Sequence, residues 1–279
     1  TLTAEQLEIR KTGIGASEVS ALTGSSPYQE PIDVWLAKTG RADALPENEA
    51  MRLGNELEGA LTVLYAGRTG RMVERHASTH RHPDFPHVLA TPDAIVAASS
   101  ARVDPANDGR RVRIEGALHI AKPVRDTDLG VQADALALVR SVQMRQWRET
   151  CSASGCVYAL TWSDKPIDSQ GFRVSTGHAN TTPFPFSSQR FVAGEVRLGA
   201  YVVEPVAALA QAAAAPHAVD LSNLQPNLAA SFGAQEGELV TGDPAHPAQG
   251  DLRVGYSIVP AGARALVGVQ RGGKLVLDH

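Results

Sequence analysis

Residues 91–96 read Thr-Pro-Asp-Ala-Ile-Val, and residues 116–123 read Gly-Ala-Leu-His-Ile-Ala-Lys-Pro. Each stretch contains a short apolar run next to Gly or Pro, which is typical of a buried strand. We therefore predict strands at 94–98 and 112–120. Asp93 then lies at the end of a strand-like run, where its carboxylate can face a site at the edge of a sheet.

The strongest helical pattern lies upstream, at residues 49–67. Its apolar residues recur mostly at steps of three and four, the repeat of one helix face; they are Met51, Leu53, Leu57, Leu61, Leu64 and Tyr65. We predict that Leu57, Leu61 and Leu64 bury this face and that Glu58 lies beside it. Shorter elements are predicted as helices from Thr3, at 18–22 and at 31–38, and as strands at 72–73, 87–90, 157–162 and 172–175.

Downstream of the two central strands, residues 131–150 predict a long helix. Leu138 and Val142 lie eight and four residues before Gln146, so the three side chains share one helix face. This placement favours an inward role for Gln146, although the side chain could equally satisfy backbone groups. Helices and strands in this order indicate an α/β (α+β) fold with a mixed central sheet flanked by helices.

The composition changes near Gly194, and we divide the chain after residue 190. Residues 1–190 are predicted to form the main domain. Residues 191–250 predict an Ala-rich helix followed by a Pro/Gly/Ala-rich linker. Residues 251–279 alternate apolar and other residues around Gly and Pro, which predicts a small C-terminal β module.

The overall composition gives no sign of a nucleic-acid-binding, membrane-spanning or disulfide-rich protein. A net charge of −4 does not indicate nucleic-acid binding, so any DNA groove must come from local clustering of basic residues. No apolar run reaches about 18 residues, so we predict no membrane span. Cys151 and Cys156 do not define a disulfide framework, and we expect small packing residues in a reduced, intracellular setting.

Two carboxylates suggest a metal site. Glu58 from the helix and Asp93 from the strand end could hold one hard divalent cation through oxygen. Magnesium in such a site polarises a phosphodiester and generates a hydroxide nucleophile. The alternatives are a solvated helix charge for Glu58 and a turn residue for Asp93.

A series of short motifs in one order points to a family. The chain resembles the YqaJ-like viral recombinase and phage lambda exonuclease family, within the PD-(D/E)xK nuclease superfamily, from about Arg10 to Ser175. The resemblance implies a restriction-endonuclease-like core. The motifs that carry it are RKTGIGASEVS at 10–20, LTGSSPY at 22–28, VWLAKTG at 34–40, MRLGNELE at 51–58, Thr69-Gly70, His82-Pro83 and ATPD at 90–93.

The resemblance implies a role for several residues. Arg10 and Ser17 match the residues that hold the 5′-phosphate of a DNA end, which suits a guanidinium fork and a hydroxyl. Glu58 and Asp93 match metal-binding acids, and Gln146 matches an active-site glutamine. The implied cofactor is Mg²⁺, with Mn²⁺ as a substitute. Hydrolysis of duplex DNA ends in phage recombination is the implied reaction.

The resemblance also implies a biological setting. We expect a phage- or prophage-encoded protein in the cytoplasm of a bacterial host. The expected partners are double-stranded DNA ends and a single-strand annealing recombinase, and a homo-oligomer is consistent with the family. No membrane partner is expected.

The sequence departs from the family at the second strand. The family pattern Gly-Leu-Val-Glu-Ile-Lys-x-Pro aligns with residues 116–123, so His119 replaces the glutamate and Ala121 replaces the lysine. His119 is either a third metal ligand or a satisfied core histidine. Glu115, on the same strand face, and Lys122, through a bulge, are possible replacements. Three functions stay open: a metal-dependent exonuclease with impaired activity, an inactive protein that binds DNA ends or a recombination partner, or a structural phage protein whose Asp251–His279 module docks to a partner.

Overall fold

The computed structural model describes residues 4–42, 49–75, 78–82, 85–180, 183–219, 224 and 226–277. The protein combines helices with mixed sheets, which confirms the predicted α+β class. The chain divides into two compact units, and each is described by itself. The first unit comprises Thr1–Leu118, Arg197–Pro205 and Ala263–His279, and the second comprises His119–Val196 and Val206–Gly262.

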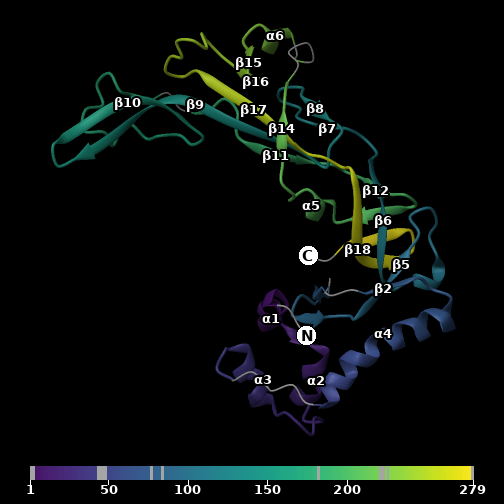
Figure 1. Cartoon of the computed structure of the whole chain (residues 1–279). Coiled ribbons are helices and arrows are strands. Elements are labelled where there is room, and N and C mark those ends of the chain that lie inside the picture. Colours follow the sequence, from purple (N-terminus) through teal and green to yellow (C-terminus); the bar gives the residue numbers. More distant parts are fainter. Residues whose placement is uncertain are drawn as a thin grey trace. The chain divides into compact units, whose positions relative to one another are not determined.

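The helices predicted near the N-terminus are confirmed, although the predicted start at Thr3 lies outside the described residues. Local capping explains where two of them begin. The carboxylate of Glu18 accepts the N–H of Gly15 at 2.7 Å, and Asp33 accepts the N–H of Glu30 at 2.9 Å, directly before Pro31. The helices are α1 (Ala4–Lys11), α2 (Ala16–Leu22), α3 (Pro31–Lys38) and α4 (Glu49–Thr69) (Figure 1).

The burial predicted for the apolar face of α4 is wrong. Leu57, Leu61 and Leu64 are 47%, 59% and 49% exposed. Their spacing identifies an apolar helix face, but spacing does not show whether another element covers that face. In the described part of the chain, this face of α4 stays largely open to solvent.

The larger sheet of the first unit positions Asp93. Its strand order is β12-β13-β19-β18-β6-β5-β2, and a smaller sheet has the order β1-β4-β3. β5 runs parallel to β6, with Val96 opposite Val112, and Ile95, Val112 and Ile114 are buried. Asp93 directly precedes β5, so the buried sheet fixes its backbone. The strands are β1 (Ile14–Gly15), β2 (Val73–Arg75), β3 (His80–Arg81), β4 (Val88–Ala90), β5 (Ala94–Ala98), β6 (Arg111–Ile120), β12 (Val196–Leu198), β13 (Tyr201–Glu204), β18 (Ala263–Arg271) and β19 (Lys274–Leu277), with a 3₁₀ turn η1 (Pro105–Asn107) between β5 and β6.

The second unit is built on an antiparallel sheet with the order β10-β9-β17-β16-β15. Strand β11 also pairs with β9, strand β14 pairs with β17, and β7 pairs with β8. Figure 1 shows β9 and β10 as long paired strands. The elements are β7 (Val124–Arg125), β8 (Gln132–Ala133), β9 (Ala137–Ser152), β10 (Gly155–Ser163), β11 (Gln189–Val192), α5 (Val206–Leu209), β14 (Ala215–His217), α6 (Pro226–Ala229), β15 (Gly233–Gln235), β16 (Glu238–Val240) and β17 (Leu252–Val259).

The long helix predicted at 131–150 is wrong, because this stretch forms β8 and most of β9. Leu138, Val142 and Gln146 do share one buried face, as predicted. A step of four residues, however, is also two strand repeats of two, so it fits a strand face as well as a helix face. Pairing with β10 and β17 on either side of β9 selects the strand.

The strand predicted at 172–175 is also wrong, whereas its expected partner at 157–162 forms β10. Two backbone N–H groups of this stretch bond to side chains, and the N–H of Phe172 bonds to the carbonyl of Ser169 in a turn, instead of to a neighbouring strand. Arg173 N–H donates to Glu149 at 2.7 Å, and Val174 N–H donates to the Tyr158 hydroxyl at 3.0 Å. Side-chain acceptors therefore hold this stretch as a loop.

The C-terminal strands predicted within 251–279 are confirmed as β17, β18 and β19. Strand β17 belongs to the second unit, and β18 and β19 belong to the first. Between residues 191 and 250, the expected Ala-rich helix is limited to α5 (Val206–Leu209), and short strands occupy much of the expected linker. The Ala-rich stretch ends in β14, where Ala215–His217 pair with β17 instead of extending a helix.

The expectation that Cys151 and Cys156 are reduced packing residues is wrong. The two cysteines face each other in the register of β9 and β10 and form a disulfide. They lie five residues apart, so the disulfide closes the end of this hairpin. Spacing within the sequence did not reveal the pairing, because it depends on the hairpin that replaces the predicted helix.

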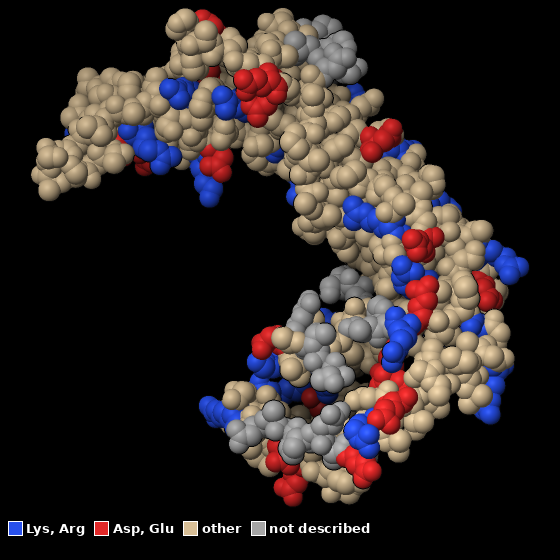
Figure 2. Space-filling model, in the orientation of Figure 1, with Lys and Arg blue, Asp and Glu red and all other residues tan. Residues whose placement is uncertain are grey.

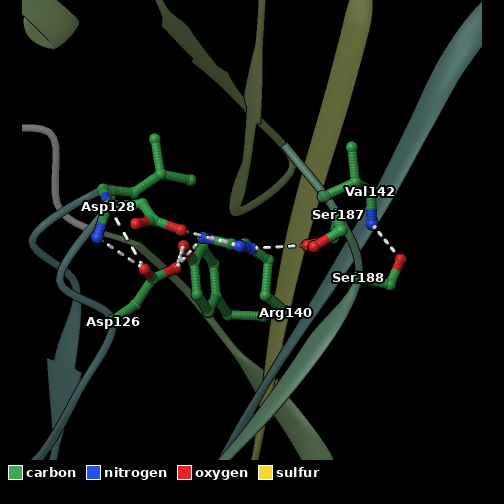
Figure 3. Close-up of polar contacts among 8 residues, drawn as sticks. Asp126, Asp128, Arg140, Val142, Ser187 and Ser188 are labelled. Atoms are coloured by element: carbon green, nitrogen blue, oxygen red, sulfur yellow. Dashed lines mark hydrogen bonds and ion pairs between the residues drawn. The ribbon is translucent and has the colours of Figure 1, made fainter. Parts of the chain in front are cut away.

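A buried ion-pair network centred on Arg140 anchors the second unit (Figure 3). Arg140 donates to Asp126 at 2.7 Å, to Asp128 at 3.0 Å and to the carbonyl of Ser187 at 2.8 Å. The Tyr256 hydroxyl donates to Asp126 at 2.6 Å. Burial lowers the pKa of Arg140, but the bonds to Asp128 and Asp126 outweigh burial and raise it. The guanidinium therefore stays charged and joins β9, the turn after β7 and the chain before β11.

Above pH 10, we expect the free energy of unfolding of the second unit to fall by up to about 1.4 kcal/mol per pH unit from Tyr256 alone. Burial, and then the hydrogen bond to Asp126, raise the pKa of Tyr256 from 10.0. The folded state thus keeps this proton to a higher pH than the unfolded chain. The contribution is fully present below pH 10 and is lost as the pH rises towards the folded pKa.

Urea unfolding at a series of alkaline pH values measures this slope. Tyr256→Phe is expected to flatten the slope by the contribution of one tyrosine. Tyr28→Phe is the control, because Tyr28 lies in the first unit and is 90% exposed. Equal slopes for the wild type and Tyr256→Phe would contradict the prediction.

Candidate functional site

The structure brings Arg10 and Ser17 together. Arg10 lies in the last turn of α1 and Ser17 in the first turn of α2, with β1 between the two helices. Nη2 of Arg10 donates to Oγ of Ser17 at 3.0 Å. The Arg10 side chain is 25% exposed, so an arriving anion can reach its guanidinium.

Glu18 and Lys38 complete this cluster, and neither was singled out from the sequence. The Glu18 carboxylate lies 3.7 Å from Nη2 of Arg10 and 2.8 Å from Nζ of Lys38. Lys38, at the end of α3, also donates to the carbonyl of Arg10. We call Arg10, Ser17, Glu18 and Lys38 the Arg10 cluster. Two cations and one carboxylate leave one net positive charge, so the cluster has the character of an anion site.

The motifs contained a signal for the two missed residues. Glu18 lies within RKTGIGASEVS, and Lys38 lies within VWLAKTG. Only the packing of α3 against α1 and α2 shows that the two motifs meet at one carboxylate. A search for phosphate donors by motif alone finds Arg10 and Ser17 but not the third donor.

Glu58 and Asp93 line one open pocket of the first unit, with a volume of about 780 Å³. Glu58 comes from the middle of α4, and Asp93 directly precedes β5. The Glu58 side chain is 32% exposed and lies 3.5 Å from the guanidinium of Arg75. Two carboxylates on one pocket offer the oxygen ligands that a hard divalent cation such as Mg²⁺ prefers.

The basic residues that line this pocket are arginines, namely Arg68, Arg110 and Arg111. None of the chain's lysines, at positions 11, 38, 122, 165 and 274, is among the lining residues. An arginine offsets negative charge, but its guanidinium stays protonated and does not take a proton from an attacking water. The two carboxylates could therefore hold a cation, but the arginines do not supply the proton acceptor that hydrolysis requires.

None of the residues of the altered family motif lines this pocket. His119 is exposed near the end of β6, and with Ala121 it belongs to the second unit. The possible replacement Lys122 lines a separate pocket of about 560 Å³ together with Arg125. Glu115 points to Arg113, at 3.3 Å, and is 69% exposed. Neither replacement lines the pocket that Glu58 and Asp93 share.

Gln146 is fully engaged with the backbone of a loop. The side chain is 1% exposed on β9. Its Nε2 donates to the carbonyl of Lys165 at 3.0 Å, and its Oε1 accepts the N–H of Ile167 at 2.9 Å. This geometry matches the structural alternative, in which the amide satisfies buried backbone groups.

Because the chain has a net charge of −4, a DNA-binding groove would require basic residues to cluster locally on the surface. On the face drawn in Figure 2, Lys and Arg side chains are interspersed with Asp and Glu instead of forming one broad basic surface. Arg75 pairs with Glu58, and Arg113 pairs with Glu74 at 3.0 Å. No broad basic surface is seen on this face, so small sites such as the Arg10 cluster are the better candidates for recognition of a phosphate.

The C-terminal half of the chain is similar to a second family. Residues 141–277 match the family model of Transmembrane protein 43. The chain is 28% identical to Transmembrane protein 43 of Homo sapiens over 211 residues, covering 68% of this chain and 51% of that protein. It is 33% identical to the Transmembrane protein 43 homolog of Drosophila melanogaster over 108 residues, covering 34% and 29%. Among the helices that the structure describes, none is long and apolar enough to cross a membrane.

The N-terminal motifs correspond to the other match. Residues 5–159 match the family model of the YqaJ-like viral recombinase domain. The chain is 32% identical to protein YqaJ of Bacillus subtilis (strain 168) over 98 residues, covering 35% of this chain and 31% of that protein. It thus spans about a third of YqaJ and about half of human Transmembrane protein 43. From the extent of the family match, the chain belongs to the YqaJ-like viral recombinase domain family.

Proposed function

We propose that this chain binds the 5′-phosphorylated ends of duplex DNA through the Arg10 cluster and does not cut them. The observation that carries the proposal is the 3.0 Å contact of Arg10 with Ser17, joined to the ammonium group of Lys38 through Glu18, which faces both cations. A guanidinium, a hydroxyl and an ammonium are donor types that bind phosphate oxygens. Membership of a viral recombinase family supports DNA as the source of that phosphate.

Glu18 is expected to lower the affinity of the Arg10 cluster for phosphate. Its carboxylate accepts the N–H of Gly15 and faces both cations, so it stands where a phosphate would bind. A terminal phosphate carries roughly −2 charge at pH 7 and competes with Glu18 for Arg10 and Lys38. We expect a modest affinity that falls with salt, because phosphate contacts release counterions.

The direct test compares two duplexes that differ only at the 5′ end. Fluorescence anisotropy without divalent cations is expected to show about tenfold tighter binding of the 5′-phosphorylated end than of the 5′-hydroxyl end. The difference is expected to shrink as salt rises. Equal affinities at every salt concentration would overturn the proposal.

Lys38→Met is expected to weaken binding of the phosphorylated end by about three- to tenfold and to leave the 5′-hydroxyl end nearly unchanged. Lys38 supplies a point charge that pairs with Glu18 and donates to the backbone carbonyl of Arg10, and methionine retains most of its length without the charge. Lys11→Met is the matched control, since the Lys11 ammonium pairs with Glu8 at 2.5 Å on exposed α1. The same loss in both variants would indicate a general charge effect and not a phosphate site.

Metal-dependent hydrolysis is the second candidate, and the pocket shared by Glu58 and Asp93 favours it. Mg²⁺ or Mn²⁺ held by the two carboxylates would supply a polarised phosphodiester and a bound hydroxide. The chain's own residues would have to orient the attacking water, and no lysine lines the pocket to do so. We therefore expect binding of DNA ends to exceed any cutting.

Incubation of 5′-phosphorylated linear duplex with Mg²⁺ or Mn²⁺ is expected to leave the DNA intact. The substitution pair His119→Glu and Ala121→Lys is not expected to create digestion, because neither residue lines the pocket of Glu58 and Asp93. Glu58→Gln with Asp93→Asn is the control. Metal-dependent digestion that this control abolishes would establish the exonuclease and overturn the non-cutting part of the proposal.

A further inference from the structure

The hairpin of β9 and β10 places two sulfurs and a carboxylate on one face of the sheet. Cys151 is opposite Cys156 in the strand register, and Glu149 precedes Cys151 by two residues. Residues two apart on a strand point to the same face. One carboxylate oxygen of Glu149 and both sulfurs lie within 4.8 Å of one another.

The Glu149 carboxylate is held in position by donors that leave room for another ligand. The Tyr158 hydroxyl donates to Oε1 at 2.5 Å, and the N–H of Arg173 donates to the same oxygen at 2.7 Å. Among the described residues, no hydrogen bond to Oε2 is seen. The Tyr158 ring is itself fixed by stacking on His178, with ring centroids 4.0 Å apart. Outer contacts of this kind orient a metal-binding carboxylate.

The reduced hairpin would present a specific donor set. Four residues separate Cys151 and Cys156, which lies within the spacing of paired cysteine ligands in zinc sites. Two thiolates with one carboxylate favour a borderline-soft divalent cation such as Zn²⁺ over a hard cation such as Mg²⁺. Cys151 is exposed and Glu149 and Cys156 are partly exposed, which leaves a fourth position for water.

We propose that reduction of the Cys151–Cys156 disulfide creates a site for one Zn²⁺-like cation, bound by both cysteine sulfurs and Glu149. The site is distinct from the Arg10 cluster and from the pocket of Glu58 and Asp93, and it lies in the part of the chain that matches Transmembrane protein 43. In the oxidised protein both sulfurs are joined in the disulfide and are not thiolate ligands. Metal binding and disulfide formation therefore exclude each other.

The reductive step balances with a phosphine as the reductant. The phosphine takes oxygen from one water and becomes its oxide, and the two electrons it loses cleave the sulfur–sulfur bond. The two protons of that water end on the two sulfurs. Each thiol then releases its proton when the cation binds, because the thiolate is the ligand.

The test uses the full chain and Co²⁺ as a spectroscopic probe. The protein is reduced with a phosphine under inert gas, freed of reductant and titrated with Co²⁺, with and without prior reduction. We expect thiolate-to-cobalt charge-transfer absorption that saturates at one equivalent in the reduced protein only, and loss of the signal when Zn²⁺ is added. No charge-transfer band after reduction, or the same band in the oxidised protein, would overturn the proposal.

Two variants test the ligand set. Glu149→Gln is expected to weaken Co²⁺ binding by roughly tenfold or more while the charge-transfer band persists. Cys151→Ser with Cys156→Ser is expected to abolish the band. Glu204→Gln is the matched control, because Glu204 is a partly exposed carboxylate paired with Lys274 in the first unit. An unchanged affinity in Glu149→Gln would remove the carboxylate from the site and refute the proposed ligand set.

Discussion

Replacement of Arg140 with methionine is expected to lower the free energy of unfolding of the second unit by about 3–5 kcal/mol. Arg140 is 1% exposed and pairs at 2.7 Å with Asp126, which is 0% exposed. Without the guanidinium, Asp126 keeps hydrogen bonds from Tyr256 and from backbone N–H groups but loses its cation. A buried charge that has lost its partner is strongly destabilising. Methionine fills much of the same volume, so the loss reports the charge more than a cavity.

The tryptophans allow the second unit to be followed separately. Trp147 and Trp162 lie in that unit, and Trp35 lies in the first. In a Trp35→Phe background, urea unfolding monitored by tryptophan fluorescence therefore reports the unit that contains Arg140. Arg148→Met is the control, because Arg148 is exposed on the same strand and its loss is expected to change stability by less than about 0.5 kcal/mol. A loss below about 1 kcal/mol for Arg140→Met would contradict the role assigned to the network.

A double variant separates the buried charge from packing. If the cost of Arg140→Met comes from the uncompensated carboxylate, then adding Asp126→Asn removes that charge and is expected to recover part of the loss. Asparagine still accepts a hydrogen bond from Tyr256 through its amide oxygen. Strictly additive losses would instead indicate that the two side chains act independently.

Replacement of Arg10 with alanine is expected to weaken binding of the 5′-phosphorylated end by about 10- to 100-fold. A hydrogen bond to a charged group contributes about 1.5–3 kcal/mol, and 1.4 kcal/mol corresponds to a factor of ten in affinity. Arg10 is expected to matter more than Lys38, because a planar guanidinium can bond two phosphate oxygens at once. The affinity for a 5′-hydroxyl end is expected to change little, so the loss should appear as a loss of discrimination.

Two further variants interpret this result. Arg10→Lys keeps the charge but not the donor fork, and we expect an affinity between those of the wild type and Arg10→Ala. Arg52→Ala is the control, because Arg52 is exposed on α4 and pairs with Glu56 at 2.9 Å. In Arg10→Ala, Glu18 remains paired with Lys38 at 2.8 Å in the parent geometry, so the cluster is not left with an isolated carboxylate. Wild-type discrimination by Arg10→Ala would place the phosphate site elsewhere and defeat the proposed function.

The N-terminal elements could be predicted because their signals are local. Pro31 at the start of α3 and Glu18 at the start of α2 act within one helical turn, and both helices form where predicted. The apolar run 94–98 between polar neighbours likewise forms β5 as predicted. In contrast, the alternation within 137–152 supports a strand only when pairing with distant β17 is known.

Some residues of the candidate sites could likewise be predicted from the sequence, and others could be recognised only from the structure. Arg10, Ser17, Glu58 and Asp93 were identified by motif, and the structure groups them as two pairs. Lys38 and Glu18 were missed because their contact joins different helices, and Gln146 was assigned to a helix face because its spacing fits two kinds of element. The disulfide, and the position of the Glu149 carboxylate beside its sulfurs, could be recognised only from the register of β9 and β10.

The amino-acid sequence alone predicted family membership, the short N-terminal helices and two residue pairs: Arg10 with Ser17, which are in contact, and Glu58 with Asp93, which line one pocket. These properties follow from motifs and from caps that act over a few residues. The three-dimensional arrangement was needed to show that Gln146 lies in a strand, that Arg140 is buried with Asp126, and that the apolar face of α4 is exposed. Burial and strand pairing depend on segments far apart along the chain, and a local repeat contains no information about which distant segment becomes the neighbour.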